Sequence, residues 1–199
     1  MKGCQVVLFM VLSFGSASSV FAQVDTLQHV IEMFEYTVDH PYQRGIVAGE
    51  YFPKQDFVDI DGNRFSFYDD HYDLTVVNFW SPDCKSCMEE KPNLKKMKAH
   101  YEDRKRIRFV SIVPGSPEKV KRVLSKHGDP EYQIIPVKTY KEREKLFKFK
   151  GNPRQSLVTK DGEVLAQYLT GIFTKYHLEE FIKRTDQFFR ERTALVNSL

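Results

Sequence analysis

Hydrophobic positions along the chain alternate between the pattern of a buried strand and the pattern of an amphipathic helix. Three apolar, β-branched runs have the length of strands buried on both faces of a sheet: 74–80, 106–113 and 133–137. Four segments with helical periodicity or helix-capping residues lie between or after them: 85–104, 117–127, 140–149 and 175–192. The pattern predicts one domain in which strands and helices alternate.

Two pairs of short strand-like runs surround turn sequences and therefore predict β-hairpins. The first turn is Asp61-Gly62-Asn63 and the second is Lys160-Asp161-Gly162. Strands that alternate with helices, followed by a hairpin and a last helix, imply an α/β sandwich with a central mixed β-sheet flanked by helices. Reactive groups in such sheets collect at the carboxyl ends of strands, and Cys84 stands where the strand at 74–80 gives way to a helix.

The first 22 residues have the features of a secretory signal peptide. They contain one lysine, an apolar run from Val6 to about Gly15, and small residues up to Ala22, after which cleavage is expected. The apolar run is shorter than the about 20 residues of a transmembrane helix, and retention as an N-terminal anchor is the alternative. We expect an exported protein, either periplasmic or tethered to the membrane on its periplasmic side.

The mature chain is expected to begin with a helical extension at 23–49, and the main domain follows at 50–199. Within the extension, the segment from Asp25 to His40 places a set of apolar side chains on one helical face: Leu27, Val30, Ile31, Phe34 and Val38. Loss of the signal also removes Lys2, which lowers the formal net charge from +3 to +2.

Two segments of the mature chain, 95–108 and 138–150, are locally basic. Lysine and arginine on solvated helix faces explain these segments better than a binding surface for phosphates does. No aromatic or loop motif for nucleic acid accompanies them, so nucleic-acid binding is not expected.

Of the 3 cysteines in the chain, Cys4 leaves with the signal, and Cys84 and Cys87 remain. A disulfide between them would close a short ring and restrict the unfolded chain less than a 15-residue loop, which is worth about 3 kcal/mol. A structural zinc site needs four ligands. The 6 histidines are not paired at ligand spacing: His29, His40, His71, His100, His127 and His177. We expect neither a metal nor another cofactor, and the pair is interpreted as redox-active.

The position of Cys84 at the start of a predicted helix suits a nucleophile. Unpaired backbone N–H groups and the positive end of the helix dipole favour a thiolate over a thiol, and the thiolate is the attacking species. Cys87 lies one helical turn further on and should be more buried. It is placed to resolve a mixed disulfide by attacking Cys84.

The segment NFWSPDCKSCMEEKP, residues 78–92, resembles the active-site motif of the thioredoxin superfamily, specifically of the exported TlpA/ResA-like thiol-disulfide oxidoreductases. The positions that match are Asn78, Phe79, Trp80, Cys84, Cys87, Glu90 and Pro92. The segment GNPRQSLVTKDGEV, residues 151–164, is similar to the second signature of that family, which makes Pro153 the expected cis-proline. The hairpin at 56–67 is also typical of this branch. The resemblance covers about residues 50 to 189 and implies a thioredoxin-like fold.

This resemblance also implies roles for individual residues. Pro153 would face the disulfide and shape a loop on which the substrate backbone docks, together with Asn152, Arg154 and Trp80. For Trp80, simple burial in the core is the alternative interpretation. Glu90 would lie on the same helix face as Cys87 and shuttle the proton of the resolving thiol, although a solvated helix glutamate is the alternative.

The chain departs from the family pattern close to the cysteines. Asp83 stands where many relatives carry an aromatic residue, and its carboxylate disfavours a Cys84 thiolate while Lys85 favours it. Arg154 and Gln155 are larger and more polar than the usual residues after the proline, and Asn152 before it is unusual. We expect these changes to alter the surface offered to partners rather than the basic chemistry.

The resulting hypothesis is a thiol-disulfide oxidoreductase that exchanges disulfides with partner proteins through Cys84 and Cys87. The resemblance implies a reductant supplied with electrons by a membrane-bound donor, and we expect a monomer. An oxidase or isomerase is the nearest enzymatic alternative. The non-enzymatic alternative is a thioredoxin-like binding module that uses the extension and the Arg154–Gln155 loop. A peroxidase is disfavoured because Pro82 and Asp83 do not supply the expected threonine motif.

Overall fold

The structure is a computed structural model that describes residues 45–129, 131–168, 171–172 and 174–197. The predicted signal peptide and the predicted helix at 25–40 lie outside the described residues. The strands are β1 (Phe57–Val58), β2 (Arg64–Phe65), β3 (Leu74–Phe79), β4 (Ile107–Pro114), β5 (Gln133–Val137), β6 (Arg154–Thr159) and β7 (Val164–Tyr168). The helices are α3 (Lys85–His100), α4 (Pro117–His127), α5 (Tyr140–Phe147) and α6 (Lys175–Asn197).

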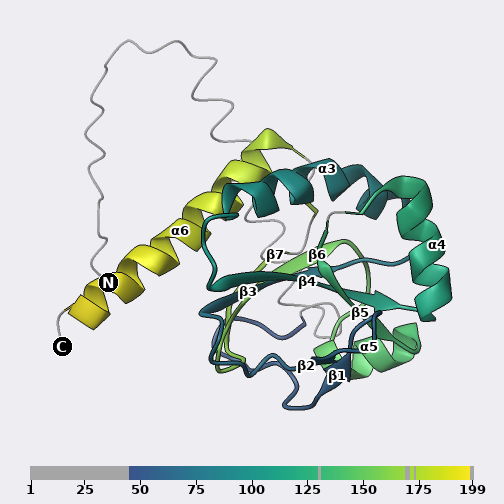
Figure 1. Ribbon diagram of the computed structural model, residues 1–199, viewed down its shortest axis with the longest axis horizontal. Coiled ribbons are helices and arrows are strands. Elements are labelled where there is room, and N and C mark those ends of the chain that lie inside the picture. Colours follow the sequence, from purple (N-terminus) through teal and green to yellow (C-terminus); the bar gives the residue numbers. More distant parts are fainter. Residues whose placement is uncertain (1–44, 130, 169–170, 173, 198–199) are drawn as a thin grey trace, which may run out of the picture. The chain divides into compact units, whose positions relative to one another are not determined.

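Five strands form the central sheet in the order β5-β4-β3-β6-β7 (Figure 1). The pairs β3–β4 and β4–β5 are parallel, whereas β3–β6 and β6–β7 are antiparallel. The sheet is therefore mixed, and the second predicted hairpin is the β6–β7 pair. The first predicted hairpin is present as the antiparallel pair β1–β2. The predicted α/β sandwich is confirmed.

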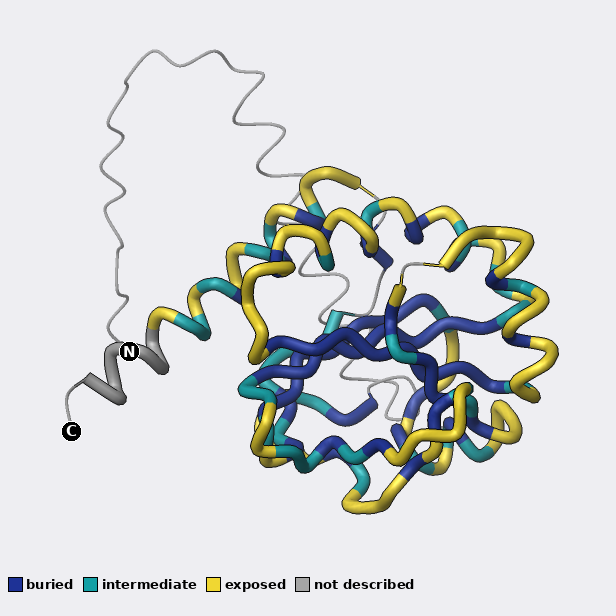
Figure 2. Tube along the Cα trace, viewed as in Figure 1, coloured by how far each residue is buried: buried dark blue, intermediate teal, exposed yellow. Residues whose placement is uncertain are grey.

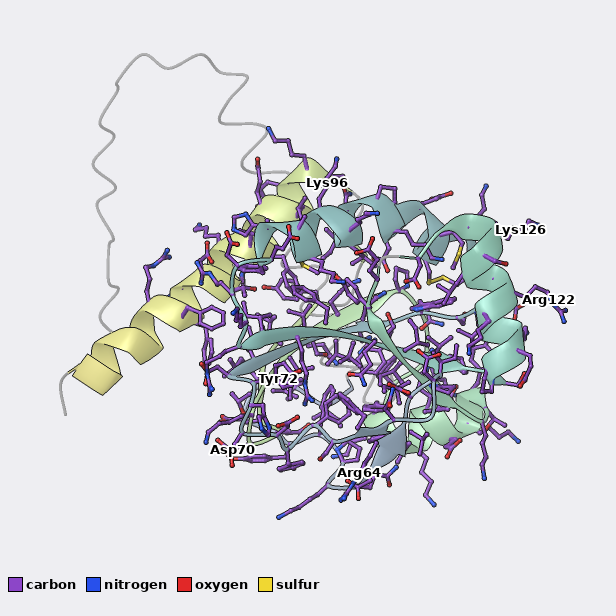
Figure 3. All side chains as sticks on the ribbon, viewed as in Figure 1. Arg64, Asp70, Tyr72, Lys96, Arg122 and Lys126 are labelled. Atoms are coloured by element: carbon purple, nitrogen blue, oxygen red, sulfur yellow. A yellow bond between two sulfur atoms is a disulfide. The ribbon has the colours of Figure 1, made fainter. Side chains whose placement is uncertain are left out.

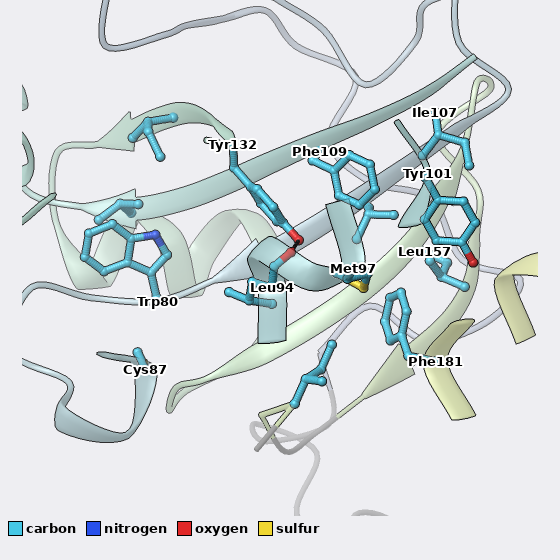
Figure 4. Packing of buried hydrophobic residues seen from close by; sticks show 14 of the residues in the cluster. Trp80, Cys87, Leu94, Met97, Tyr101, Ile107, Phe109, Tyr132, Leu157 and Phe181 are labelled. Carbon is cyan, nitrogen blue, oxygen red and sulfur yellow. Dashed lines mark hydrogen bonds between the residues drawn. The ribbon is translucent and has the colours of Figure 1, made fainter. Parts of the chain in front are cut away.

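Buried side chains on the two faces of the sheet form two separate clusters, and the central strands are buried along their whole length (Figure 2). The first cluster joins the sheet to α3, α4 and α6 (Figure 4). The second joins it to α5 and the β1–β2 hairpin. Successive residues of β3 alternate between the clusters, as the pleat of a strand requires, so Val76 belongs to the first and Val77 to the second.

Local sequence sets where two of the helices begin. The Ser116 hydroxyl accepts a hydrogen bond from the backbone N–H of Lys119 at 3.3 Å, and Pro117 occupies the first turn of α4. The helix ends at His127, and the residue that caps it, Gly128, has a φ of +83°. The longer helix α3 runs through Pro92 and ends at His100, four residues before the predicted end.

Many basic side chains on the helices are solvated. Lys96, Arg122 and Lys126 are exposed and point away from the domain (Figure 3). Arg108 differs, because its guanidinium donates to the backbone carbonyl of Ser66 and to the Asp69 carboxylate from a buried position. Within the described parts of the chain, no helix is long and apolar enough to cross a membrane.

Residues 45–49, which the sequence assigned to the N-terminal extension, contact the domain closely. The backbone N–H of Gly45 donates to the carbonyl of Lys148 at 3.1 Å, and that of Gly49 donates to the carbonyl of Val164 at 2.9 Å. Between them, Ile46 is only 1% exposed and belongs to the second cluster. These residues pack as part of the described domain.

Candidate active site

The two cysteines lie where β3 ends and α3 begins, as the sequence predicts. Cys84 is the N-cap residue of α3, and its sulfur accepts a hydrogen bond from the backbone N–H of Cys87 at 3.2 Å. The two residues form a disulfide with Cα atoms 5.3 Å apart. Cys84 is partly exposed, whereas Cys87 is 1% exposed. An external thiol can therefore approach Cys84 but not Cys87.

The surroundings of the Cys84 sulfur favour a thiolate once the disulfide is reduced. The first turn of α3 directs its unpaired N–H groups and the positive end of the helix dipole at this sulfur. The Ser86 hydroxyl oxygen also lies 3.4 Å from it. These groups stabilise negative charge on Cys84 and make it the more reactive sulfur of the pair.

Asp83, beside the reactive cysteine, is held by groups from two other helices. Its exposed carboxylate accepts hydrogen bonds from the Lys119 ammonium at 3.2 Å and from the Tyr140 hydroxyl at 3.3 Å. Because Lys119 offsets the carboxylate charge, Asp83 opposes a Cys84 thiolate less than the sequence suggested. No local pattern in the sequence predicts this pairing, since the partners lie 36 and 57 positions further along the chain.

Glu90 is completely buried, with 0% of its surface exposed. Its Oε2 accepts hydrogen bonds from the Gln155 side-chain amide at 2.8 Å and from the backbone N–H of Ile172 at 3.0 Å. Burial raises the pKa of Glu90 to about 8, although both hydrogen bonds act in the opposite direction. The alternative of a solvated helix glutamate is therefore wrong for Glu90, whereas the neighbouring Glu89 is exposed.

The peptide bond between Asn152 and Pro153 is cis, and the loop that contains it lies beside the segment leading to Cys84. The Asn152 amide donates to the Ser81 hydroxyl at 3.1 Å, and its carbonyl oxygen accepts from Arg143 of α5 at 2.6 Å. Both ends of this side chain are occupied within the protein. Asn152 thus connects α5, the proline loop and the active-site turn.

Trp80 and Arg154 do not present their side chains to a partner at the disulfide, in contrast to the predicted substrate-binding roles. Trp80 is 1% exposed, and the Lys91 ammonium lies 5.0 Å from the centre of its ring. The core interpretation of Trp80 therefore fits its position. Arg154 pairs with Phe79 and is 5% exposed, with its guanidinium 4.3 Å from the centre of the Phe149 ring.

Burial explains why the polar residues after the proline do not alter the partner surface as expected. Desolvation and, to a smaller extent, the nearby positive charge of Arg143 lower the pKa of Arg154 to about 10. Gln155 points to the opposite face of the sheet and is 0% exposed. Its amide nitrogen lies 3.2 Å from the Asn78 Oδ1 atom on the neighbouring strand, in addition to its bond to Glu90. Both side chains are internal.

No group of three or more histidine, cysteine, aspartate or glutamate residues in the described ranges is arranged to hold a metal ion. The groups gathered at the site are the cysteine pair, the buried carboxyl and the loop at Pro153. The sequence predicted these parts, but not the two buried partners, Gln155 and Arg143, that hold them. The available signal for Gln155 was its polarity within an otherwise strand-like run.

Comparisons with known proteins agree with this geometry. The chain is 26% identical over 126 residues to a thiol-disulfide oxidoreductase ResA from Bacillus thuringiensis and equally to one from Bacillus cereus, covering 63% of this chain and 71% of each relative. No family model matches the sequence.

Solved structures share the fold. A candidate DsbE-type thiol:disulfide interchange protein from Chlorobium tepidum superimposes with a TM-score of 0.59 at 20% identity, covering 69% of this chain and 94% of that one. A candidate protein disulfide isomerase from Bacteroides thetaiotaomicron gives a TM-score of 0.61 at 17% identity, covering 72% and 91% of the two chains. At these identities the likeness concerns the fold alone.

The fold is thioredoxin-like, and its Cys-x-x-Cys disulfide lies at the start of the first long described helix. In sequence the chain is similar to ResA-type thiol-disulfide oxidoreductases, and its two cysteines have the spacing of a redox-active pair.

Proposed function

We propose that the protein is an exported reductant that transfers electrons from its reduced cysteine pair to disulfides in other proteins. The observation that carries this proposal is the asymmetry of the pair, with Cys84 accessible at the helix N-terminus and Cys87 buried one turn further on. This asymmetry gives the two sulfurs different tasks in a single exchange reaction.

The reaction proceeds in two displacements. In the first, the Cys84 thiolate attacks a substrate disulfide, so that a mixed disulfide forms and one substrate sulfur leaves as a thiolate. In the second, the Cys87 thiolate attacks the Cys84 sulfur, which restores the Cys84–Cys87 disulfide and releases the second substrate thiolate. Two electrons pass from the protein to the substrate, and each substrate thiolate then takes up a proton according to its own acidity.

The second displacement requires Cys87 to lose its proton inside the protein, and we assign the acceptor role to Glu90. Both side chains are buried, and their spacing of three residues on α3 places them on the same helix face. A carboxyl with a pKa near 8 exchanges protons readily with a thiol, whose ordinary pKa is about 8.5. The ionised fraction of Glu90 would then set how fast the mixed disulfide resolves.

The loop at Pro153 would provide the docking site for the substrate backbone. Just beyond the last paired residues of β3 and β6, Phe79 and Arg154, the side chain of Asn152 donates a hydrogen bond to that of Ser81. A proline has no backbone N–H to crowd the sulfurs, and an extended substrate segment could pair with the loop beside it. Asn152 contributes by fixing the loop, since both ends of its side chain are already occupied.

Export is supported by the signal-like sequence of residues 1–22. We propose that residues 23–49 include a helical extension and that the main domain acts as a monomer in the periplasm. A reductant in an oxidising compartment needs a continuous electron supply, which we assign to a membrane-bound donor.

The reduction potential of the Cys84–Cys87 couple tests the direction of transfer. The purified mature protein is equilibrated in glutathione or dithiothreitol buffers of known potential, and the oxidised fraction is determined after acid quenching. A potential near or below about −270 mV, the level of thioredoxin, is expected for a reductant. A potential near about −120 mV, the level of a strong oxidant, would overturn the reductant and indicate disulfide formation instead.

A further inference from the structure

Glu90 is held entirely through one of its two carboxyl oxygens. Oε2 accepts from the Gln155 amide at 2.8 Å and from the backbone N–H of Ile172 at 3.0 Å. The other oxygen, Oε1, is buried and has no hydrogen-bond partner among the residues that the structure describes. Burial of a carboxyl oxygen without a partner is costly, so this arrangement calls for an explanation in terms of the reaction.

Gln155 itself is fixed by the sheet. It lies on β6 directly opposite Asn78 of β3 and is 0% exposed. Its Nε2 donates to the Asn78 Oδ1 atom at 3.2 Å as well as to Glu90. Because one nitrogen makes both contacts, the amide bridges the central strand and the helix that carries the cysteines, and its orientation leaves little freedom for the carboxyl.

We propose that Gln155 is a positioning residue that holds the Oε2 atom of Glu90, so that Oε1 is left to exchange a proton with Cys87. This inference rests on the proton-transfer role given to Glu90 under the proposed function. It goes beyond that role because it assigns the orientation of the carboxyl to a side chain on a different element of the sheet. Gln155 does not touch the sulfurs and acts only through Glu90.

Other titratable groups around the carboxyl do not replace Gln155 in this role. Tyr132, which precedes β5, is fully buried, and its hydroxyl donates to the backbone carbonyl of Leu94. Burial raises the pKa of Tyr132, and the charge of Glu90 raises it further, so it stays protonated. Lys91 follows Glu90 on α3, but its ammonium donates to the Gly128 carbonyl at 2.8 Å.

The direct test follows the ionisation of Glu90 in the oxidised mature chain. Glutamate labelled with ¹³C at the side-chain carboxyl gives a separate NMR signal for each residue, and the Glu90 signal is the one absent from Glu90→Gln. In Gln155→Met, which keeps length but removes the donor, we expect the midpoint of this signal to rise by about one pH unit. An unchanged midpoint would overturn the proposal.

A control variant separates this effect from the loss of a glutamine amide bound to another carboxylate. Gln133 donates to the Asp59 carboxylate at 3.0 Å on the outer strand β5. Gln133→Met removes the same kind of hydrogen bond, and we expect the Glu90 midpoint to stay at its wild-type value. A comparable rise in this variant would show that Gln155 has no special relation to Glu90.

Two further measurements cover the case in which Gln155→Met does not fold. Gln155→Val has a β-branched side chain that suits a strand and also lacks the donor, so the same rise is expected. In the unmodified protein, the side-chain N–H signals of Gln155 should shift with the midpoint of Glu90. If they do not respond to pH in that range, the contact has no electrostatic role and the proposal fails.

The pH profile of the second displacement connects this contact to the reaction. The reduced protein is mixed with a fluorescent protein disulfide, and the resolution rate is followed as the pH is raised. Gln155→Met should move the midpoint of the profile upward together with the NMR midpoint. If Glu90→Gln leaves the profile unchanged, the proton-transfer function fails. If Glu90→Gln abolishes the pH dependence of the resolution rate but Gln155→Met does not shift its midpoint, only the positioning role of Gln155 fails.

Discussion

The two faces of the central sheet are both buried, yet they bury different kinds of side chain. The face toward α5 and the hairpin contains a cluster of phenylalanine rings in edge-on contact, such as Phe52 and Phe67 with centroids 4.8 Å apart. The face toward α3 contains Trp80, Glu90 and Gln155, each with a buried polar atom that has no hydrogen-bond partner among the described residues.

This difference indicates how stability and chemistry are separated in one small domain. A buried polar atom without a partner costs about 1–3 kcal/mol, whereas a buried aromatic ring stabilises the fold. The phenylalanine face can therefore offset the cost of the polar face. The separation is not complete, because Arg143 Nε and Ser156 Oγ on the phenylalanine side are also buried without a hydrogen-bond partner among the described residues.

The largest effect on chemistry is expected from Cys84→Ser, which removes the attacking sulfur. Reduction of a protein disulfide such as insulin by dithiothreitol should no longer be accelerated. Cys87→Ser should still make the first attack and then accumulate a mixed disulfide with its substrate, visible by mass spectrometry. If Cys84→Ser kept its activity and Cys87→Ser lost it, the assigned roles of the two sulfurs would be reversed.

The largest effect on stability is expected on the other face. Phe67 is 0% exposed and contacts several rings of the cluster, so Phe67→Ala should lower the free energy of unfolding by about 3–5 kcal/mol in urea denaturation. The reduction potential should be unchanged. As a control, Tyr176→Ala on α6 removes a ring that is 61% exposed and should change stability by at most about 0.5 kcal/mol. A clear change of the reduction potential in Phe67→Ala would argue against the separation of stability and chemistry between the two faces of the sheet.

A pH-dependent effect on stability is expected from Glu90→Gln. Because the pKa of Glu90 is raised from 4.5 to about 8 in the folded protein, the unfolded chain loses this proton first as the pH rises. The contribution of Glu90 to stability is therefore fully present below pH 4.5 and is lost between 4.5 and about 8. As the pH rises through this range, the wild type should lose stability relative to Glu90→Gln. The difference between their unfolding free energies should change by about 1.4 kcal/mol per pH unit at most.

The exposed neighbour offers a matched control for that experiment. Glu89→Gln makes the same chemical change one position earlier on α3, where the side chain is exposed. Its stability relative to wild type should not follow this pH dependence. If both variants showed the same dependence, the effect would come from net charge rather than from burial.

The smallest effect is expected from Asn152→Ala, which breaks the link between the proline loop and the active-site turn. The Michaelis constant for a protein disulfide should rise by about tenfold, the effect of losing a hydrogen bond of about 1.4 kcal/mol. Exchange with dithiothreitol, which needs no docking loop, should be unaffected. Equal losses with both reactants would show that Asn152 supports the cysteines themselves rather than substrate docking.

The parts of the structure that follow local patterns could be predicted from the sequence. The apolar run at 74–80, the capping signal at Ser116 and the two turn sequences each correspond to a described element. The positions of Cys84 and Cys87 follow in the same way, because they depend only on where a strand ends and a helix begins.

The environment of the site could not be predicted, because it depends on which strand lies next to which. Gln155 meets Asn78 only because β6 pairs with β3 in a particular register. A shift of one residue would exchange the faces of Gln155 and Arg154. For this reason both residues were expected at the partner surface, although the fold places each of them inside.

Trp80 is the single tryptophan in the chain, and its ring belongs to the same buried cluster as Cys87 (Figure 4). All tryptophan emission from the protein therefore originates beside the redox centre, with the Lys91 ammonium 5.0 Å from the ring centre. The native protein thus carries an intrinsic optical reporter at this position. We therefore expect opening and closing of the disulfide to change the tryptophan emission, which a fluorescence measurement on reduced and oxidised protein can check without any label.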